Sequence, residues 1–406
     1  MPRLEGVATL MQLNSDCISY IVGDSETIRN MEQVPVLRPF DENMIEYFNT
    51  VSKILLNNAE AKGYPDVITF AFWCRKASIK SLQKPYIGNI NRMGRGVAFH
   101  ITPSNVAVNF AYSLAAGMLS GNANIVRLPS NEFEQVKMIC EALFKAADNK
   151  IKQYICLVKY GHDQTITDCL SALCDTRIIW GGDQTIETIR KSPLKPRATE
   201  ITFSDRYSIC VINSDNYLKE EKKKFIAEGF FNDTYLTDQN ACTSPRLIVW
   251  MGNCIEEAQL VFWNELHAIV KERYLLQPIH SVSKLINLCK HAAGNGKIFR
   301  EDFKDNYITR VKAERLTGSL MDCKGSNGYF IEYAAKSLVE LLPLFTSQCQ
   351  TLSYLGLEAG KIQDFVMALG PRGVDRIVPI GKTMEFSLVW DGHDLIRSLT
   401  RELNIK

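Results

Sequence analysis

The feature that most constrains the fold of this chain is a regular alternation of short apolar runs and helix-like segments between residues 95 and 212. Runs such as 97–101 and 124–128 have the length and apolar content of buried strands. The segment that follows the second run carries apolar residues at helical spacing, namely Val136, Ile139, Cys140, Leu143 and Phe144. Strands that alternate with helices through short connections form parallel, doubly wound sheets, so the sequence predicts an α/β fold.

Shifts in this pattern predict the domain organisation. A chain of 406 residues is long enough to bury more than one core. Residues 1–85 indicate a mixed α/β lead-in that packs on the cofactor domain, and residues 86–215 indicate a nucleotide-binding domain. Residues 216–370 indicate a second α/β domain, and residues 371–406 a C-terminal tail.

Composition argues against several classes of protein. The formal net charge of +2 provides no global field that would draw the chain to nucleic acid or anionic lipid. No apolar run is long enough to span a membrane, and the N-terminus lacks the apolar core of a signal peptide. The 12 cysteines are scattered without a C-x-x-C pair, so we expect free thiols in a reducing cytoplasm. The six histidines lie far apart, so no metal site is expected.

Polar residues and glycines follow the predicted strands, at the positions where a doubly wound sheet binds nucleotides. Asn105 comes after the first strand, and Arg127, Pro129 and Ser130 end the second. Gly181-Gly182 lies between a later strand and a helix, where bare backbone amides could face a phosphate, but two glycines at such a turn more often serve plain turn chemistry. A G-x-G-x-x-G fingerprint is absent from the sequence.

One cysteine differs from the others in its surroundings. Cys242 lies between a polar stretch and the strand-like run 247–250, among small and polar residues that leave a thiol accessible. Most of the other cysteines lie in apolar runs, where a thiol behaves as a small hydrophobe. Gln239, just before it, is expected to shape the loop. Local sequence alone does not make Cys242 a nucleophile.

The ordered set of these segments resembles the aldehyde dehydrogenase superfamily and, more closely, the LuxC-type acyl-CoA (fatty acid) reductases. The marks of the resemblance are Ser104-Asn105, Gly121-Asn122, Trp180-Gly181-Gly182-Asp183, Asn240-Ala241-Cys242-Thr243-Ser244-Pro245, 350–354, 372–381 and Trp390-Asp391-Gly392. The resemblance implies a Rossmann-type cofactor domain, a second α/β catalytic domain and a small oligomerisation element.

The resemblance also implies roles for individual residues. Cys242 would attack an acyl thioester and carry the acyl group. The Asn105 amide and the Cys242 backbone N–H would stabilise the oxyanion, and one such donor is typically worth about 3 kcal/mol of barrier. NADPH is the implied cofactor. Its binding residues would be Arg127, whose guanidinium suits a 2′-phosphate, together with Pro129, Ser130, Gly181 and Gly182.

The sequence departs from the superfamily at two places. Glu200 falls where the hydrolytic enzymes carry a Glu-Leu-Gly-Gly general base, but Thr202-Phe203 stands in place of the glycines. Glu200 either helps to deprotonate Cys242 or merely lines the site. The segment that grips the nicotinamide ribose is also unclear, since 328–332 matches it poorly, and Glu332 is left out of the site.

These observations predict an NADPH-dependent reductase that converts an acyl-CoA or acyl-protein thioester to an aldehyde. The resemblance further implies an acyl-activating synthetase as a partner and a homo-oligomer in which residues 376–389 supply an exchanged strand. Two alternatives stay open at this point: a cysteine acyltransferase or thioesterase without a cofactor, and a non-catalytic subunit beside an acyl-activating enzyme.

Overall fold

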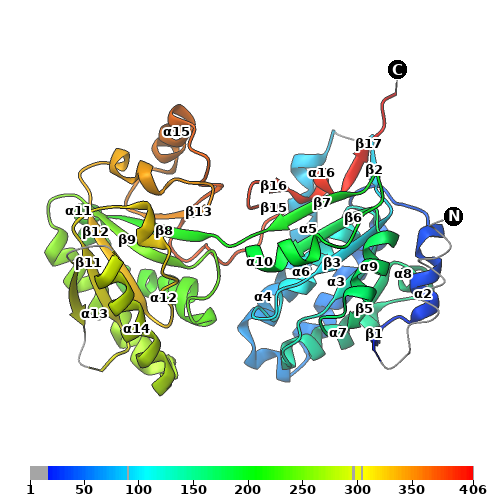
Figure 1. The fold of residues 1–406 in the computed structure, drawn as a ribbon, viewed down its shortest axis with the longest axis horizontal. Coiled ribbons are helices and arrows are strands. Elements are labelled where there is room, and N and C mark those ends of the chain that lie inside the picture. The colour runs from blue at the N-terminus through cyan, green and yellow to red at the C-terminus, as the bar shows by residue number, and fades with distance from the viewer. Residues whose placement is uncertain (1–16, 89–90, 295–297, 303–304, 406) are drawn as a thin grey trace. The chain divides into compact units, whose positions relative to one another are not determined.

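The computed structural model describes residues 17–88, 91–294, 298–302 and 305–405. These residues form two units, each built around its own sheet (Figure 1). The first unit comprises the chain up to Ser204 together with the C-terminal segment from Ser387. The second unit comprises residues 205–386.

The first unit contains a six-stranded sheet in the order β1-β5-β4-β3-β6-β7. Its strands are β1 (Ser19–Val22), β3 (Val97–Ile101), β4 (Ala123–Arg127), β5 (Ile155–Lys159), β6 (Thr176–Trp180) and β7 (Thr199–Phe203). All neighbours are parallel except the edge pair β1–β5. The chain runs outward from β3 to β4 and β5, then returns to β6 on the other side of β3. Ligands of such sheets bind where the strand order reverses in this way.

The helices of the first unit bury apolar stripes against this sheet and against one another. They are α2 (Ser25–Asn30), α3 (Glu42–Asn57), α4 (Pro65–Trp73), α5 (Lys76–Gln83), α6 (Asn109–Leu119), α7 (Glu134–Ala146), α8 (Asn149–Lys152), α9 (Gln164–Leu173), α10 (Asp183–Ile189) and α16 (Leu395–Ser398), with 3-10 turns η1 (Met31–Gln33), η2 (Glu60–Gly63) and η3 (Lys84–Tyr86). In α3, for example, Ile45, Phe48 and Val51 are fully buried, and the helix packs on α4, α6 and α7. The lead-in is therefore part of the first unit.

The second unit contains a seven-stranded sheet in the order β10-β11-β12-β9-β8-β13-β14. Its strands are β8 (Tyr207–Asn213), β9 (Pro245–Met251), β10 (Ile298–Asp302), β11 (Thr309–Ala313), β12 (Tyr329–Ala334), β13 (Cys349–Leu355) and β14 (Arg376–Pro379). Only β10–β11 is antiparallel among these pairs. Successive residues of β9 enter two separate cores, Leu247 and Val249 on one face and Ile248 and Trp250 on the other, as the strand period requires.

The helices of the second unit cover these two cores. They are α11 (Ser214–Lys219), α12 (Lys223–Thr234), α13 (Ile255–Arg273), α14 (Pro278–Gly294) and α15 (Ala359–Leu369), with 3-10 segments η4 (Tyr235–Thr237), η5 (Gly318–Met321) and η6 (Leu338–Leu344). Within the part of the chain that the structure describes, no helix in either unit has the length and apolar character needed to cross a bilayer.

The division between the units differs from the boundary expected at residue 215. Strand β8, which falls inside the predicted nucleotide-binding domain, pairs with β9 and β13 in the second sheet. The boundary follows β7 instead, at Ser204. The pattern could not reveal this, because β7 and β8 are both short strands and periodicity does not say which sheet a strand joins.

The predicted C-terminal segment is also divided between the two sheets. Strand β14 pairs with β13 in the second unit. The chain then returns to the first unit, where β15 (Val389–Trp390) and β16 (His393–Asp394) form a hairpin. Strand β17 (Thr400–Glu402) pairs with β2 (Arg92–Gly94). Exchange of residues 376–389 between subunits stays a prediction.

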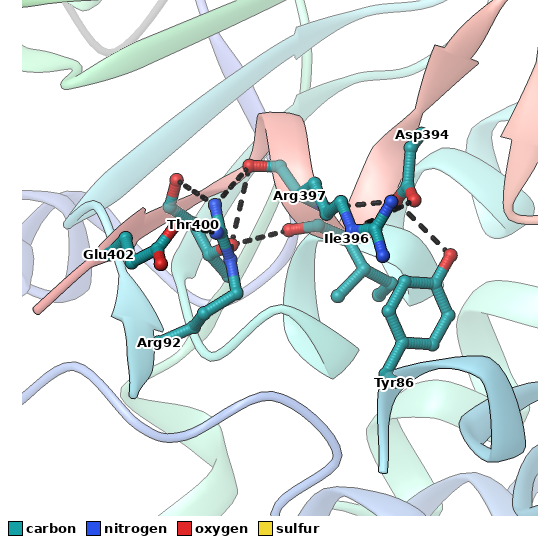
Figure 2. A network of polar contacts seen from close by, with 7 residues as sticks. All are labelled: Tyr86, Arg92, Asp394, Ile396, Arg397, Thr400 and Glu402. Atoms are coloured by element: carbon teal, nitrogen blue, oxygen red, sulfur yellow. Dashed lines mark hydrogen bonds and ion pairs between the residues drawn. The ribbon is translucent and has the colours of Figure 1, made fainter. Parts of the chain in front are cut away.

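A polar network holds the returning segment on the first unit (Figure 2). The Arg92 guanidinium donates to Thr400 Oγ1 at 2.7 Å and to the Arg397 carbonyl at 2.9 Å, and it pairs with Glu402 at 2.9 Å. Tyr86 Oη donates to Asp394 Oδ1 at 3.1 Å. These contacts join residues about 300 positions apart and make the C-terminal tail an integral part of the first unit.

Candidate active site

The loops after β3 and β4 lie side by side at the carboxyl edge of the first sheet. Thr102 Oγ1 donates to the Arg127 carbonyl at 2.7 Å, and Ser130 Oγ donates to Ser104 Oγ at 2.9 Å. Asn105 is exposed in the turn that precedes α6, and Ser130 is exposed as well. The structure thus brings the predicted residues of these two loops to one edge.

Gly181 and Gly182 lie at the end of β6, the neighbour of β3 on the other side. The Gly181 N–H donates to the Phe203 carbonyl at 3.1 Å, and Gly182 is the N-cap residue of α10. A Cβ atom on Gly181 would lie 3.1 Å from the Thr185 side chain, which is tight. The Asn105 loop and the two glycines therefore flank the point where the strand order reverses, which is the place where a dinucleotide fits this kind of sheet.

Arg127, the last residue of β4, is held in place by the end of β5. Its Nη2 donates to the carbonyls of Tyr160 (3.3 Å) and Gly161 (2.8 Å), and its Cζ lies 4.5 Å from the centroid of the Tyr160 ring. These contacts engage one guanidinium nitrogen and the face of the group, so the charge is fixed at the carboxyl edge. Pro129 is buried beside it.

Beneath this edge lies a buried polar chain that the sequence did not indicate. His100 Nδ1 lies 2.7 Å from Ser113 Oγ, which also accepts a hydrogen bond from Trp180 Nε1 at 2.9 Å. His100 Nε2 lies 3.0 Å from Asn124 Oδ1. Burial lowers the pKa of His100 to about 4, although the Asn124 hydrogen bond opposes the shift. A neutral imidazole at pH 7 with both nitrogens engaged supports the sheet rather than the chemistry.

Glu200 is engaged in ion pairs within the first unit. Its Oε2 accepts from Arg177 Nε at 2.9 Å and Nη2 at 2.5 Å, and its Oε1 accepts from Arg190 Nε at 2.7 Å. In the β6–β7 register Glu200 faces Arg177, three positions before Phe203, which is roughly 10 Å from the carboxyl edge. This arrangement favours a structural role, and the catalytic role stays a prediction.

In the second unit, Cys242 lies in the loop between η4 and β9 and is partly exposed. The loop begins with Asp238 and Gln239 in the left-handed region, at φ 51° and 59°, which is unfavourable for residues with a Cβ. Gln239 offsets this, because its buried amide donates to the carbonyls of Pro245 and Tyr329 and accepts from the N–H groups of Gly328 and Tyr329. The prediction that Gln239 shapes the loop is confirmed.

Further contacts fix the loop on both sides of the thiol. Tyr274 Oη donates to Asp238 Oδ1 at 2.6 Å. Ser208 Oγ donates to the Cys242 carbonyl at 2.7 Å, and Thr243 Oγ1 donates to Met384 Sδ at 3.2 Å. These contacts hold the backbone around Cys242 in one conformation.

Most other cysteines contrast with Cys242. Seven of them are buried, namely Cys74, Cys140, Cys156, Cys169, Cys174, Cys210 and Cys349. Burial raises the pKa of Cys210 and of Cys349 to about 12. Thiols in such surroundings stay protonated and act as small apolar groups.

One arginine close to Cys242 in the sequence has unusual surroundings in the structure. Arg246, in β9, is 5% exposed, and its Nε is buried without a hydrogen-bond partner. An arginine four positions after the cysteine was the available signal, but arginines are usually exposed and the sequence does not report burial.

Glu332, in β12, belongs to a saturated network instead. Its Oε1 accepts from Trp250 Nε1 (2.8 Å), Gln259 Nε2 (3.0 Å) and Trp263 Nε1 (2.8 Å). Its Oε2 accepts from Arg310 Nε at 2.7 Å. Because both carboxylate oxygens are engaged by buried or part-buried donors of the core, this carboxylate has a structural role.

Comparison with known proteins decides the family. A family model described as acyl-CoA reductase (LuxC) matches residues 7–287. The chain belongs to this family. The predicted resemblance is therefore confirmed, and it rests on more than half of the chain.

Relatives and solved structures agree with this assignment. A long-chain acyl-protein thioester reductase of Aliivibrio fischeri is 24% identical over 316 residues, which cover 75% of this chain and 62% of the relative. One of Photorhabdus laumondii is 25% identical, covering 77% and 63%. The chain thus spans less than two thirds of these relatives. A solved NAD-dependent benzaldehyde dehydrogenase of Corynebacterium glutamicum matches with a TM-score of 0.66 at 12% identity, covering 96% of this chain and 94% of its own. The predicted aldehyde dehydrogenase fold is confirmed.

Proposed function

We propose that this protein reduces an acyl thioester to an aldehyde with NADPH, through an acyl group carried on Cys242. The observation that carries the proposal is a partly exposed thiol on a fixed loop, in a member of the acyl-CoA reductase family, while seven other cysteines are buried. A thioester suits this chemistry, because sulfur delocalises poorly into the carbonyl and leaves the carbon open to attack.

The chain's own residues would act on the acyl group in turn. The Cys242 sulfur attacks the thioester carbonyl, and the thiol of the donor leaves. The Cys242 backbone N–H and the Asn105 side-chain amide are the proposed donors to the oxyanion, at a typical value of about 3 kcal/mol each. Ser208 and Gln239 hold the loop that presents the sulfur.

The first unit is the proposed site of the cofactor. The carboxyl edge at the strand-order reversal offers exposed Ser130 and Asn105, the small residues Gly181 and Gly182, and the fixed charge of Arg127, all of which suit a dinucleotide. When bound, the nicotinamide supplies the hydride that reduces the acyl group. A guanidinium at this edge favours NADPH over NADH, because it pairs with a 2′-phosphate. A nicotinamide cofactor also agrees with the solved neighbour, which is described as NAD-dependent.

The relatives suggest the substrate and the partners. Since they are described as long-chain acyl-protein thioester reductases, a long-chain acyl group on a protein or on CoA is the proposed donor. An acyl-activating synthetase would supply that thioester, and a homo-oligomer is the proposed assembly. Native mass spectrometry of the purified chain tests the assembly directly.

A labelling experiment tests the reaction. The full chain is mixed with a labelled long-chain acyl-CoA, denatured and mapped by peptide mass spectrometry, before and after addition of NADPH. We expect a thiol-labile label on Cys242 that NADPH discharges as aldehyde. A label that NADPH leaves in place and water removes would instead identify a thioesterase, and removal by another acceptor an acyltransferase. Absence of any label would identify a non-catalytic subunit.

A further inference from the structure

A charged side chain lies buried within a few residues of the proposed nucleophile. Arg246 is 5% exposed and its buried Nε has no hydrogen-bond partner. The buried Arg177 is paired with Glu200, and the partly buried Arg310 is paired with Glu332. A guanidinium removed from water without a counter-charge is strongly unfavourable, so a negative charge close to Arg246 is expected in the working protein.

The backbone pairing at Arg246 is irregular. In the β8–β9 register Ser208 pairs with Pro245 and Ile209 pairs with Leu247, so Arg246 is an extra residue in a β-bulge. Bulges re-aim a side chain and are frequent beside active sites. Ser208, at the same step of the ladder, also donates to the Cys242 carbonyl at 2.7 Å. One short region of β8 therefore supports both Arg246 and the cysteine loop.

The charges that act on Arg246 come from Cys242 and Asp205. Burial lowers the pKa of the Arg246 guanidinium, whereas Cys242 and then Asp205 raise it. Asp205 lies before β8 and is 2.6 Å from Lys324 Nζ, so its charge is already shared with another cation. Cys242 is consequently the group whose ionisation would best compensate Arg246.

We propose that Arg246 is a positioning residue that keeps Cys242 in its thiolate form. This inference rests on the proposed function, in which Cys242 is the nucleophile. An ordinary thiol is mostly protonated at pH 7, and the thiolate is the reactive species. A neighbouring arginine stabilises the thiolate most strongly where water is excluded, as it is around Arg246.

The pair of Arg246 and the Cys242 thiolate would act in both the first and the last step of the reaction. At entry, the Cys242 thiolate forms the bond to the acyl carbon, and the thiolate of the donor leaves and takes a proton from solvent. After hydride has been added to that carbon, the oxyanion collapses, the carbon–sulfur bond breaks and the electron pair returns to Cys242. Arg246 would stabilise the sulfur as nucleophile in the first step and as leaving group in the last.

The test measures the rate at which iodoacetamide alkylates Cys242 in the full chain as a function of pH, read from the Cys242 peptide by mass spectrometry. We expect a midpoint below that of ordinary cysteine, about 8.5. Arg246→Met should raise the midpoint and slow alkylation at pH 6.5 about tenfold or more, and Arg246→Lys should restore most of the rate. Arg206→Met is the matched control, because Arg206 is ion-paired with Asp375, and it should leave the midpoint unchanged.

Two results would overturn the inference: a wild-type midpoint near 8.5, which needs no variant to fold, or a folded Arg246→Met protein with the wild-type midpoint. The pH dependence of alkylation is measured without any enzymatic turnover. A low, Arg246-dependent midpoint without acylation by long-chain acyl-CoA would keep the inference and reject the proposed function. Acylation and reduction by the protein, together with an unshifted alkylation midpoint in Arg246→Met, would keep the proposed function and reject the inference.

Discussion

Each unit of the protein buries an arginine between neighbouring strands, and the two arginines have different surroundings. Arg177 in β6 faces Glu200 in β7, and both groups are engaged by hydrogen bonds within the first unit. Arg246 occupies a bulge in β9, where no carboxylate faces it among the described residues of that register and its Nε lacks a partner. A buried charge with complete hydrogen bonding is satisfied within the fold, whereas an incompletely paired one is unfavourable unless a further negative charge lies close to it.

The strongest test of this comparison removes the nucleophile. Cys242→Ser should lower the rate of aldehyde formation by at least about 10³-fold, because removing a covalent nucleophile leaves only binding and oxyanion stabilisation. The rate is followed through NADPH absorbance with a long-chain acyl-CoA, and NADPH binding should persist. The matched control is Cys289→Ser, an exposed thiol of the same unit. Equal rates for Cys242→Ser and the parent protein would contradict the acyl-cysteine mechanism.

The next largest effect is expected at the exposed Asn105. Asn105→Ala should lower kcat by about 10²–10³-fold, the usual cost of one oxyanion donor. Asn105→Asp keeps the shape of the side chain but replaces the donor with a negative charge, so its loss should be at least as large. Ser104→Ala, at the neighbouring exposed position, should lie near the parent rate. A small loss in both Asn105 variants would remove this residue from the mechanism.

Variants of Glu200 distinguish a structural role of its carboxylate from a catalytic one. Glu200→Ala leaves Arg177 buried without its partner, which should cost about 3–5 kcal/mol of unfolding free energy in urea. Glu200→Gln retains one acceptor and should cost less. The kcat of the folded fraction of the Gln variant should stay within a few-fold of the parent. A folded Gln variant with a 100-fold lower kcat would instead support the general-base role.

The burial of His100 predicts that the first unit becomes less stable in acid. Its pKa falls to about 4 in the folded state through burial, below the unfolded value of about 6.5. The neutral His100 therefore stabilises the folded state at pH values above the unfolded-state pKa. This contribution, roughly 3 kcal/mol at most, is lost as the pH falls through the folded-state pKa. Urea unfolding at pH 7.5 and pH 4.5 should show this loss in the parent and a smaller one in His100→Gln. Identical pH dependence in the two proteins would contradict the assignment.

The burial of Asp233 predicts that the second unit, in contrast, becomes less stable as the pH rises. The Asp233 carboxylate accepts from the N–H groups of Gly381 and Thr383, yet burial dominates and raises its pKa to about 6. Because the folded pKa lies above the unfolded one, its contribution is present at low pH and is lost as pH rises through about 6. Relative to Asp233→Asn, the parent should lose roughly 2 kcal/mol between pH 4 and pH 7. A parent that gains stability over this range relative to the variant would refute the prediction.

Much of the fold could be predicted because its signals are local. The strand ends at Ile101, Arg127 and Trp180 follow from short apolar runs and the helices that come after them. The Asn105 loop and Gly181-Gly182 reach one edge because parallel strands share their direction. The boundary at Ser204 could not be predicted, since the partners of β8 are strands that begin at residues 245 and 349.

The candidate site shows the same limit. The polar setting of Cys242 and the position of Gln239 before it are visible in the sequence, and both correspond to the observed loop. The ion pairs of Glu200 were not visible, because they join side chains 10 and 23 positions away. The burial of Arg246 was hidden for a different reason: it lies in β9, an inner strand that is buried almost throughout, although arginines are usually exposed.

The sequence by itself determined the order of strands and helices, the α/β class, the membership of the LuxC family and the polar setting of Cys242. These depend on residue type and on spacing over a few positions. Only the tertiary structure decided which charged groups are paired, which strands belong to each sheet, and that Arg246 is buried while Glu200 is held in ion pairs. Pairing depends on register and exclusion of water between strands far apart in the chain, and no local pattern encodes either one.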